Sequence, residues 1–325
     1  MHTENGSRPQ VSVIIPTLNA GSELTELLKR LSTQSIKPLE VIIIDSMSAD
    51  GTADRAREAG AQVLMVDRSE YDHGGTRNRA TESAKGDILL FMTQDALPYD
   101  DYLIEQLTKP LIESKKIVYA YARQLARPDA DVLERLARQY NYPEVSLVKT
   151  SKDIEKMGIK TFFCSNVCAA IKKQTFEEMG RFQEPVIFNE DLFMAAKCIL
   201  TGYEVAYCSE AIVYHSHNYT SSQQFKRYFD NGISMRCNTW IRPYSAVGKA
   251  GSQLVKLQLK ELWRQREWRL IPKLITESAA KLVGYKLGMN YRFIPSFMSR
   301  RLSMHRHILS QMQGRTGSPG AVFKQ

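Results

Sequence analysis

Carboxylates that follow or begin apolar segments are the residues of this sequence best suited to chemistry. Asp95 comes shortly after the apolar run Ile88–Met92, which has the length and composition of a strand buried on both faces of a sheet. In open α/β sheets, ligands lie at the carboxyl ends of such strands. A carboxylate there can hold a hard divalent cation, which in turn can hold a diphosphate. Taken alone, Asp95 could instead begin a turn or cap the helix that follows.

Two further groups of titratable residues begin or follow predicted elements. Glu190 and Asp191 begin an amphipathic segment that extends to Leu200. A positioned carboxylate can take the proton of an attacking hydroxyl group, although acids in the first turn of a helix are also favoured by the helix dipole. His215 and His217 follow a short apolar segment, where a histidine is often a hydrogen-bonded surface residue.

The elements that would position these residues alternate regularly over the first 95 residues. Apolar runs predict strands at 11–15, 39–44, 62–66 and 88–92. Helical periodicity and turn residues predict helices at 24–31, 53–60 and 77–84. This alternation is typical of an α/β protein with a doubly wound, mostly parallel sheet. The first strand leads into Pro16-Thr-Leu-Asn19 rather than into G-x-G-x-x-G, which disfavours a dinucleotide-binding fold but leaves nucleotide binding open.

The middle of the chain continues this pattern less regularly. Periodicity predicts helices at 102–113, within 125–142, at 172–179 and at 190–200. Strands are predicted at 117–121, 204–207 and 211–214. Strand-like apolar content over 161–171 surrounds the polar pair Ser165-Asn166.

The last ninety residues differ in charge from the rest of the chain. Residues 236–325 contain 17 Lys and Arg against 3 Asp and Glu, whereas residues 1–235 contain 27 against 32. Leucines and aromatics alternate there with basic residues, as in basic amphipathic helices that lie on an anionic membrane surface. The same pattern could be a solvated helical face packed on the main domain, or a nucleic-acid surface. No nucleic-acid motif accompanies it, so we expect a membrane surface and no nucleic acid.

Composition also indicates the compartment. The five cysteines are odd in number and no two are spaced as CxxC, so we expect no disulfide framework and a reducing, cytosolic environment. Residues 1–10 are polar, lack the apolar core of a signal peptide and are expected to be disordered. The sequence has no run of 18 apolar residues, so it predicts no membrane-spanning helix.

Five stretches in order carry a resemblance to a known family. They are Val11-Ser-Val-Ile-Ile-Pro-Thr-Leu-Asn19, Val41-Ile-Ile-Ile-Asp-Ser-Met-Ser-Ala-Asp-Gly-Thr52, Gly74-Gly-Thr-Arg-Asn-Arg-Ala80, Gly86-Asp-Ile-Leu-Leu-Phe-Met-Thr-Gln-Asp-Ala96 and Asn189-Glu-Asp-Leu-Phe193. In this order and spacing they resemble the family 2 glycosyltransferases, inverting sugar-nucleotide enzymes of the GT-A fold. The resemblance implies a catalytic domain at 11–235, with a nucleotide-binding half at 11–98 and an acceptor-binding half at 99–235. A basic, membrane-associating helical region would follow at 236–325.

The resemblance implies a set of donor-binding residues. They are Pro16, Thr17, Asn19, Asp45, Arg77, Asn78 and Gln94. Thr17, Asn19 and Asp45 would line the pocket of the nucleotide base. There Asp45 would accept a hydrogen bond from a pyrimidine N3–H group. Arg77 and Asn78 would face the diphosphate.

The resemblance also implies a divalent metal, Mg²⁺ or Mn²⁺. Asp95 stands where the acidic metal motif of the family ends, but Thr93-Gln94-Asp95 here holds a single carboxylate. His215 matches a later metal or diphosphate ligand of the family, and His217 is the less favoured choice.

Asp191 matches the catalytic base of the family, with Glu190 beside it, and Ser165 and Asn166 are expected to contact the acceptor. The base would take the proton of the attacking sugar hydroxyl. A divalent ion with Arg77 would offset the charge of the leaving nucleoside diphosphate. A single displacement of this kind inverts the anomeric centre and needs no covalent nucleophile.

A finer resemblance involves Glu70-Tyr-Asp-His-Gly-Gly-Thr-Arg77, Phe91-Met-Thr-Gln-Asp-Ala-Leu-Pro98 and the segment 219–229. These stretches are similar to those of bacterial rhamnosyltransferases that use dTDP-rhamnose to build O-antigen or cell-wall polysaccharide. Such acceptors are commonly carried on a polyprenyl diphosphate. The resemblance therefore implies a lipid-linked glycan acceptor and an enzyme peripheral on the inner, cytoplasmic face of the cell membrane.

Three alternatives remain at the level of sequence. The first is a UDP-hexose-dependent transferase of the same fold, because uracil and thymine present the same N3–H edge. The second is a nucleotidyltransferase, which would carry a Gly-rich basic loop where this chain has Pro16-Thr-Leu-Asn19. The third is a membrane scaffold that kept the fold and lost the chemistry, against which Asp191 and His215 argue.

Overall fold

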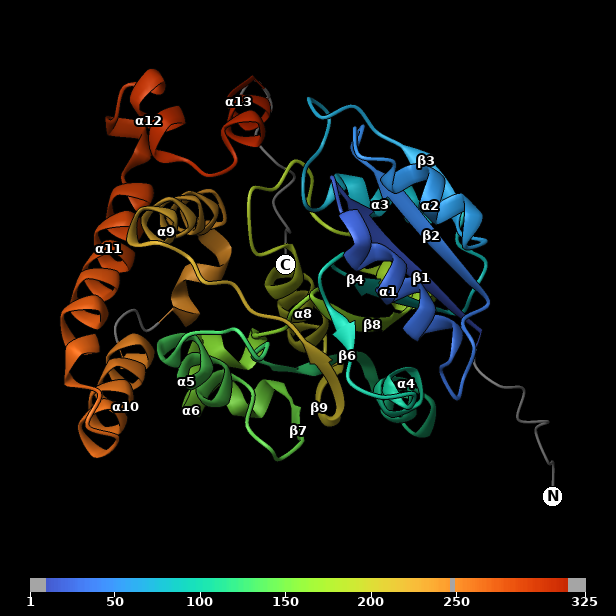
Figure 1. Cartoon of the computed structure of the whole chain (residues 1–325), viewed down its shortest axis with the longest axis horizontal. Coiled ribbons are helices and arrows are strands. Elements are labelled where there is room, and N and C mark those ends of the chain that lie inside the picture. Colours follow the sequence, from blue (N-terminus) through green and yellow to red (C-terminus); the bar gives the residue numbers. More distant parts are fainter. Residues whose placement is uncertain (1–9, 246–248, 315–325) are drawn as a thin grey trace.

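The computed structural model describes residues 10–245 and 249–314 (Figure 1). The predicted disordered segment 1–10 lies outside these residues except for Gln10. Two layers of helices enclose a central mixed sheet, and a group of helices from the C-terminal part of the chain flanks it.

The first half of the sheet confirms the predicted alternation of strands and helices. Its elements are β1 (Val11–Thr17), α1 (Gly21–Ser32), β2 (Glu40–Asp45), α2 (Thr52–Glu58), β3 (Gln62–Met65), α3 (Gly75–Thr81) and β4 (Ile88–Met92). The strands are parallel, in the order β3-β2-β1-β4. Their side chains are apolar and mostly buried in β1, β2 and β4, as expected of strands covered on both faces.

The second half of the sheet contains a reversed strand. The order continues from β4 through β8 (Cys168–Lys172) and β6 (Ile117–Leu125) to β9 (Glu204–Tyr214). Strand β8 is antiparallel to both of its neighbours, and β6 is parallel to β9. The amino end of β8 therefore lies at the same edge of the sheet as the carboxyl ends of β1, β2, β4, β6 and β9. Short strands β5 (Leu97–Pro98) and β7 (Leu147–Lys149) pair with β9.

Several boundaries differ from the sequence prediction, and two of them change how the elements are divided. The segments 204–207 and 211–214 were expected to be separate strands, but they form one strand, β9. In its pairing with β6, Cys208 lies opposite Ala122 and Ile212 lies opposite Arg123, so the residues of β9 between them bulge while the ladder continues. The helix expected within 125–142 is confined to α5 (Val132–Asn141), because Leu125 still belongs to β6.

The two faces of the sheet are covered by different helices. One core contains the buried leucines of α1 and those of α4 (Leu103–Glu113). The core of the other face contains residues of α3, α7 (Lys173–Glu178) and α8 (Glu190–Leu200). These layers hold the strands rigidly, so the side chains at the strand ends occupy defined positions.

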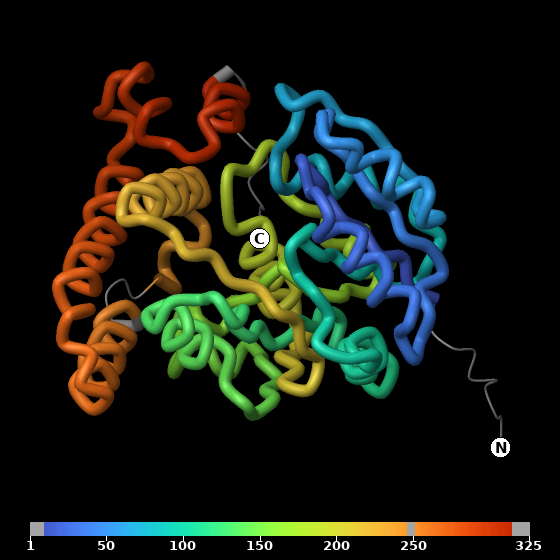
Figure 2. Tube along the Cα trace, viewed as in Figure 1, coloured from blue at the N-terminus to red at the C-terminus, as the bar shows by residue number. Residues whose placement is uncertain are grey.

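The C-terminal region is helical, as predicted. It consists of α9 (Ser221–Cys237), α10 (Lys249–Arg264), α11 (Ile271–Met289), α12 (Ser296–Leu302) and α13 (Arg306–Gly314). A short helix, α6 (Ile154–Met157), lies earlier in the chain. Helices α9 and α11 pack closely (Figure 2). A Cβ atom at Gly288 would come within 2.0 Å of the Phe229 carbonyl oxygen. The expected boundary at residue 235 falls inside α9. Among the described helices, none combines the length and apolarity that crossing a bilayer requires.

Candidate active site

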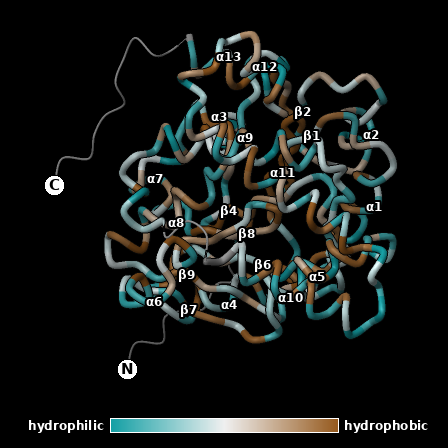
Figure 3. The backbone as a smooth tube through the Cα atoms, turned by 90° about the vertical axis from the view of Figure 1, so that its left-hand side faces the viewer, coloured by the Kyte–Doolittle hydropathy of each residue, from teal (hydrophilic) through white to brown (hydrophobic). Residues whose placement is uncertain are grey.

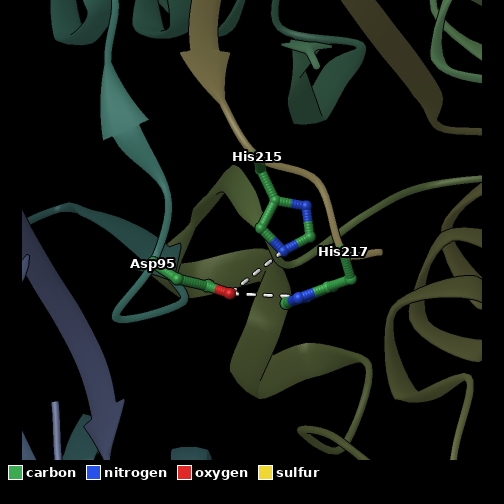
Figure 4. Close-up of side chains that lie close together, drawn as sticks. All are labelled: Asp95, His215 and His217. Atoms are coloured by element: carbon green, nitrogen blue, oxygen red, sulfur yellow. Dashed lines mark ion pairs between the residues drawn. The ribbon is translucent and has the colours of Figure 1, made fainter. Parts of the chain in front are cut away.

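A carboxylate and two imidazoles converge at the carboxyl ends of β4 and β9 (Figure 4). Asp95 Oδ2 lies 3.5 Å from His215 Nε2 and 3.3 Å from His217 Nε2. The three potential ligand atoms lie within 4.8 Å of one another. A carboxylate with two imidazoles is a donor set that divalent transition metals accept.

The protonation states of these groups suit a cation. Burial lowers the pKa of His215, although Asp95 opposes this effect by favouring the protonated ring. Burial and the neighbouring His215 lower the pKa of His217 to about 4. Burial would raise the pKa of Asp95, but the protonated form of His215 outweighs it and holds that pKa below its usual range. Near neutral pH, two neutral imidazoles and an ionised carboxylate face one another, and a cation between them would accept a lone pair from each.

A second acidic group lines the same cavity. Asp191 and the buried Glu190 begin α8, and Glu190 forms a 3.5 Å ion pair with the buried guanidinium of Arg77. The backbone N–H of Asn166 donates to Asp191 Oδ2 at 3.0 Å, and the Asn166 amide lies 3.2 Å from Glu190 Oε1. Burial and the charge of Glu190 raise the pKa of Asp191 above its ordinary value.

Local backbone geometry explains how these acids reach the sheet edge. Asn189 precedes α8 with φ of 70°, a left-handed conformation that asparagine tolerates better than most residues. This turn starts α8 beside the segment that leads into β8. Because β8 is reversed, Ser165 and Asn166 before it lie at the edge where the parallel strands end. Residues from both halves of the sequence therefore meet there.

Together these groups line a cavity of about 210 Å³. Among the residues expected at the site it brings together Arg77, Asp95, Ser165, Asn166, Glu190, Asp191, His215 and His217. The lining also includes residues to which the sequence analysis assigned no role, namely His73, Thr93, Val167, Phe188, Asn189 and Arg227.

The residues expected at the nucleotide base form a separate network at the ends of β1 and β2. Asp45 is fully buried, and Thr17 Oγ1 donates to its Oδ1 at 2.8 Å. Ser48 donates its hydroxyl to Oδ1 and its backbone N–H to Oδ2 of the same carboxylate. Asn19 ties the two loops together, because its Oδ1 accepts from Ala49 N and its own N–H donates to Ser48 Oγ.

Three other expected donor residues have different surroundings. Pro16 is buried within β1, where it pairs with Ile44. The Gln94 side chain holds the backbone of Leu18, whose N–H donates to Gln94 Oε1 at 2.8 Å. Asn78 points away from the metal candidates.

Asn78 Nδ2 donates to Phe182 O at 2.9 Å and to Glu184 Oε2 at 2.8 Å. It lines a larger cavity of about 780 Å³, together with Glu184, Asp72 and Arg181. That cavity contains none of the metal candidates or of the acids at the start of α8.

Of the cavity residues that the sequence analysis left without a role, His73 and Arg227 are the ones with basic side chains. Burial and the charge of Arg77 lower the pKa of His73 to about 3. The guanidinium of Arg227 lies 4.6 Å from the ring centroid of Phe188 and 5.7 Å from that of Tyr219. Both residues belong to stretches that carry the finer resemblance, 70–77 and 219–229, which was the only signal available for them.

The C-terminal helices reach the cavity at His73. Asp230 of α9 accepts backbone N–H groups of Met304 and His305 at 2.9 and 3.0 Å. The ring of His305 then lies edge-on to that of His73, with 4.8 Å between centroids. The C-terminal region is therefore in direct contact with a residue that lines the cavity.

Comparison with solved structures defines the fold class. The chain superposes with a TM-score of 0.59 on a mannosyltransferase of Pyrobaculum calidifontis in complex with GDP-Man and Mn²⁺, covering 87% of this chain and 88% of that one at 18% identity. The TarS protein of S. aureus (residues 1–349) in complex with UDP-GlcNAc gives a TM-score of 0.54 at 17% identity, over 95% and 92% of the two chains. The fold is thus the GT-A fold of nucleotide-sugar transferases, with a helical C-terminal extension.

Sequence comparison places the chain within that class. Residues 12–180 match the profile of glycosyl transferase family 2. The chain is 39% identical to the O-antigen chain rhamnosyltransferase WbaN of Salmonella anatum, over 94% of this chain and 97% of that protein. It is 40% identical to the O-antigen chain rhamnosyltransferase RfbN of Salmonella typhimurium over the same shares. The chain belongs to glycosyltransferase family 2, and it is a glycosyltransferase.

Proposed function

We propose that this glycosyltransferase moves rhamnose from dTDP-rhamnose to a hydroxyl group of a glycan acceptor, with inversion at the anomeric carbon. Two relatives near 40% identity over almost the whole chain are O-antigen chain rhamnosyltransferases, which supports this donor and this class of product. The observation that supports the proposal is the cavity that Asp191 shares with the cluster of Asp95, His215 and His217.

The base of the donor would bind at the ends of β1 and β2. Asp45 already accepts two hydrogen bonds at Oδ1 and one at Oδ2, from Thr17 and Ser48. A carboxylate oxygen accepts about two such bonds, so Oδ2 retains one lone pair. That lone pair would accept the N3–H of thymine. Asn19 would hold the adjoining loops in place.

The donor diphosphate would lie between the metal cluster and two arginines. Asp95, His215 and His217 would hold Mn²⁺ or Mg²⁺, and the ion would stabilise negative charge on the leaving diphosphate. Arg77 is anchored by its ion pair to Glu190, and Arg227 by its stacking on Phe188. These fixed guanidinium groups would stabilise the same charge without reorganising.

Asp191 would act as the general base. Its pKa is raised by burial and by Glu190, which strengthens it as a proton acceptor once ionised. The Asn166 N–H donates to the carboxylate, and the hydroxyl of Ser165, which lines the same cavity, would contact the acceptor sugar. The acceptor oxygen would lose its proton to Asp191 as it bonds to the anomeric carbon, and the bond from that carbon to the diphosphate would break.

Calorimetry of donor binding tests the donor assignment. We expect dTDP-rhamnose to bind in the presence of Mn²⁺ or Mg²⁺, and to bind much more weakly when the metal is chelated. UDP-hexoses serve as the comparison, because they present the same N3–H edge with a different sugar. Tight binding of a UDP-hexose in place of dTDP-rhamnose would overturn the rhamnosyl assignment, and failure of every sugar nucleotide would overturn the site.

We also propose that the enzyme binds an anionic membrane surface, where a polyprenyl-diphosphate-linked acceptor would be presented on the cytoplasmic face. Trp263 and Trp268 lie at the junction of α10 and α11, are 68% and 55% exposed, and have ring centroids 5.7 Å apart. Exposed Arg264, Arg266 and Arg269 surround them. Exposed aromatics flanked by cations fit the headgroup region of an anionic bilayer.

The far end of α11 repeats this combination. Phe293 and Phe297 are 83% and 64% exposed, and the neighbouring Arg292, Arg300 and Arg301 are also exposed. Exposed aliphatic side chains on α11 lie between the two ends, and apolar and polar segments alternate along this side of the molecule (Figure 3). Helix α11 has 19 residues, so the two ends are separated by roughly 28 Å at 1.5 Å per residue.

Vesicle co-sedimentation tests the membrane surface. The full chain should bind vesicles of phosphatidylglycerol and phosphatidylcholine, and bind phosphatidylcholine vesicles poorly. Replacing Arg264, Arg266 and Arg269 by Gln should weaken binding by up to about 3 kcal/mol, at about 1 kcal/mol for each cation. A control variant removes the same charge from the exposed residues Lys29, Arg57 and Lys109. Equal losses in the two variants would overturn the proposed surface.

A further inference from the structure

Gln124 of β6 is a buried residue that links the metal candidates to the acceptor side of the cavity. Its side chain is 1% exposed, and its Oε1 lies 3.1 Å from His215 Nδ1. Its Nε2 donates to Ser165 Oγ at 2.9 Å. The guanidinium of Arg138 on α5 donates to the same Oε1. The hydrogen bonds of this amide thus go to two residues of the candidate site, His215 and Ser165, and to the guanidinium of Arg138.

Arg138 determines which atom of the amide faces His215. A guanidinium group only donates hydrogen bonds, so the amide atom that contacts Arg138 must be the oxygen. The same oxygen contacts His215 Nδ1, and an oxygen of this kind only accepts. Nδ1 must therefore carry the proton. The neutral ring then presents the lone pair of Nε2 toward Asp95 Oδ2, 3.5 Å away.

We infer that Gln124 is a positioning residue that fixes the tautomer and the ring orientation of His215 for metal binding. This inference rests on the proposed role of Asp95, His215 and His217 as metal ligands. An imidazole binds a metal through an unprotonated nitrogen, and the hydrogen bond made by its other nitrogen selects which one is free. Without an acceptor at Nδ1, the ring could place an N–H group against the cation.

The backbone around Gln124 makes this arrangement specific. The bulge in β9 brings His215 next to the end of β6, where its N–H donates to Leu125 O at 2.9 Å. Arg138 is itself held by Glu134, one helical turn earlier, through a 2.7 Å ion pair. The order of support therefore runs from Glu134 to Arg138, to Gln124 and to His215.

The helix that carries Arg138 is fixed by the C-terminal region. Leu133 of α5 packs against Leu262 and Leu274 of α10 and α11 in a small apolar cluster. Lys273 donates to Asp131, the N-cap residue of α5, at 2.6 Å. The basic helices thus brace the helix that orients the Gln124 amide, which gives the tail a structural link to the metal cluster.

The tautomer can be measured without metal. Two-bond ¹H–¹⁵N correlation spectra of metal-free protein carrying ¹⁵N-labelled histidine distinguish an Nδ1–H ring from an Nε2–H ring. We expect His215 to be the Nδ1–H form in the wild-type protein and a mixture of the two forms in Gln124→Leu. An Nε2–H ring in the wild type would overturn the inference whatever the metal affinity.

Mn²⁺ affinity, measured from the free-ion signal in electron paramagnetic resonance, tests the consequence. We expect Gln124→Leu to weaken Mn²⁺ binding by about 10- to 100-fold, the range found when partners of metal-binding histidines are removed. Gln124→Glu keeps an oxygen for Nδ1–H and for Arg138, so it should retain affinity within about threefold of wild type. Gln34→Leu is the matched control, because Gln34 is also 1% exposed and contacts only α1, α4 and the loop before α4.

The outcomes separate the two levels of proposal. Gln124→Leu binding Mn²⁺ as tightly as wild type, or no more weakly than Gln34→Leu, would overturn the role of Gln124. Failure of the wild type to bind Mn²⁺ would overturn the metal assignment itself. If Gln124→Leu does not fold, Arg138→Met removes the donor that orients the amide, and it should lower Mn²⁺ affinity and mix the tautomers of His215.

Discussion

Two carboxylates of the candidate cavity have pKa values shifted in opposite directions. The imidazoles of His215 and His217 hold the pKa of Asp95 below its usual range. Burial and the adjacent charge of Glu190 raise the pKa of Asp191. Groups pushed apart in this way take different roles in one reaction. Asp95 remains an anion suited to a cation, while Asp191 is suited to receive a proton.

The largest expected effect comes from removing the base. Asp191→Asn keeps the size of the side chain but cannot take a proton, so kcat should fall by about 10³-fold, within the range of general base catalysis. Mn²⁺ affinity should stay within about twofold of wild type, because Asp191 is not one of the three residues whose potential ligand atoms cluster. Steady-state kinetics and Mn²⁺ titration measure the two quantities. Activity close to wild type would remove Asp191 from the mechanism and break the contrast between the two carboxylates.

The next largest effect should come from changing the proposed metal ligand Asp95. Asp95→Asn removes the anionic ligand, and Mn²⁺ binding should weaken by at least about 100-fold, since outer-shell changes alone cost up to that factor. Donor binding should lose its dependence on metal in calorimetry. Asp101→Asn is a control, because Asp101 is an exposed carboxylate that accepts from Thr33 and does not line the cavity. Equal Mn²⁺ affinities in the two variants would exclude Asp95 as a ligand.

The pH dependence of activity sharpens the comparison. A general base must be deprotonated to act, so kcat/KM should fall as the pH drops below the pKa of Asp191. Because that pKa is raised, the fall should occur at a higher pH than an ordinary aspartate would give. Glu190→Gln removes the neighbouring negative charge, and it should move that fall toward lower pH. Profiles of kcat/KM at saturating Mn²⁺ measure both. An unchanged profile in Glu190→Gln would show that Glu190 does not raise the pKa of Asp191.

The smallest effect on catalysis should come from Asn78. Its amide bonds to Phe182 O and Glu184, away from the metal cluster. Asn78→Ala should lower the free energy of unfolding by about 1–3 kcal/mol, because it leaves buried partners unpaired. The KM for the donor should change by less than about twofold when the protein is folded. Denaturant titration and kinetics test this, and a large rise in KM without loss of stability would restore the diphosphate role that the family resemblance implied.

Much of the fold could be predicted from the chain itself. Strands β1, β2 and β4 consist mainly of apolar residues, and each ends at a polar residue or is followed by one, so their composition and length predicted them. The prediction divided strand β9 around Ser209 and Glu210, whereas pairing with β6 continues past these residues as a bulge. Pairing with a neighbour is a property of the tertiary structure.

The residues of the candidate site were also only partly predictable from the sequence. Asp95, Asp191 and His215 could be found because each follows or begins an apolar element, and the order of motifs indicated their chemistry. Gln124 could not, since a glutamine at the end of an apolar strand carries no local signal of its partners. Its role depends on contacts to His215 and Arg138, which come from a different strand and a different helix.

The sequence by itself determined the α/β class, the alternation of the first half, the basic tail and the family, because these depend on local periodicity, charge and motif order. Only the tertiary structure decided which residues share a cavity. The reversal of β8 brings Ser165 and Asn166 to the edge where the parallel strands end. The start of α8 and the bulge of β9 then place Asp191 and His215 at the same cavity. Such positions follow from packing between distant segments, which local sequence patterns do not encode.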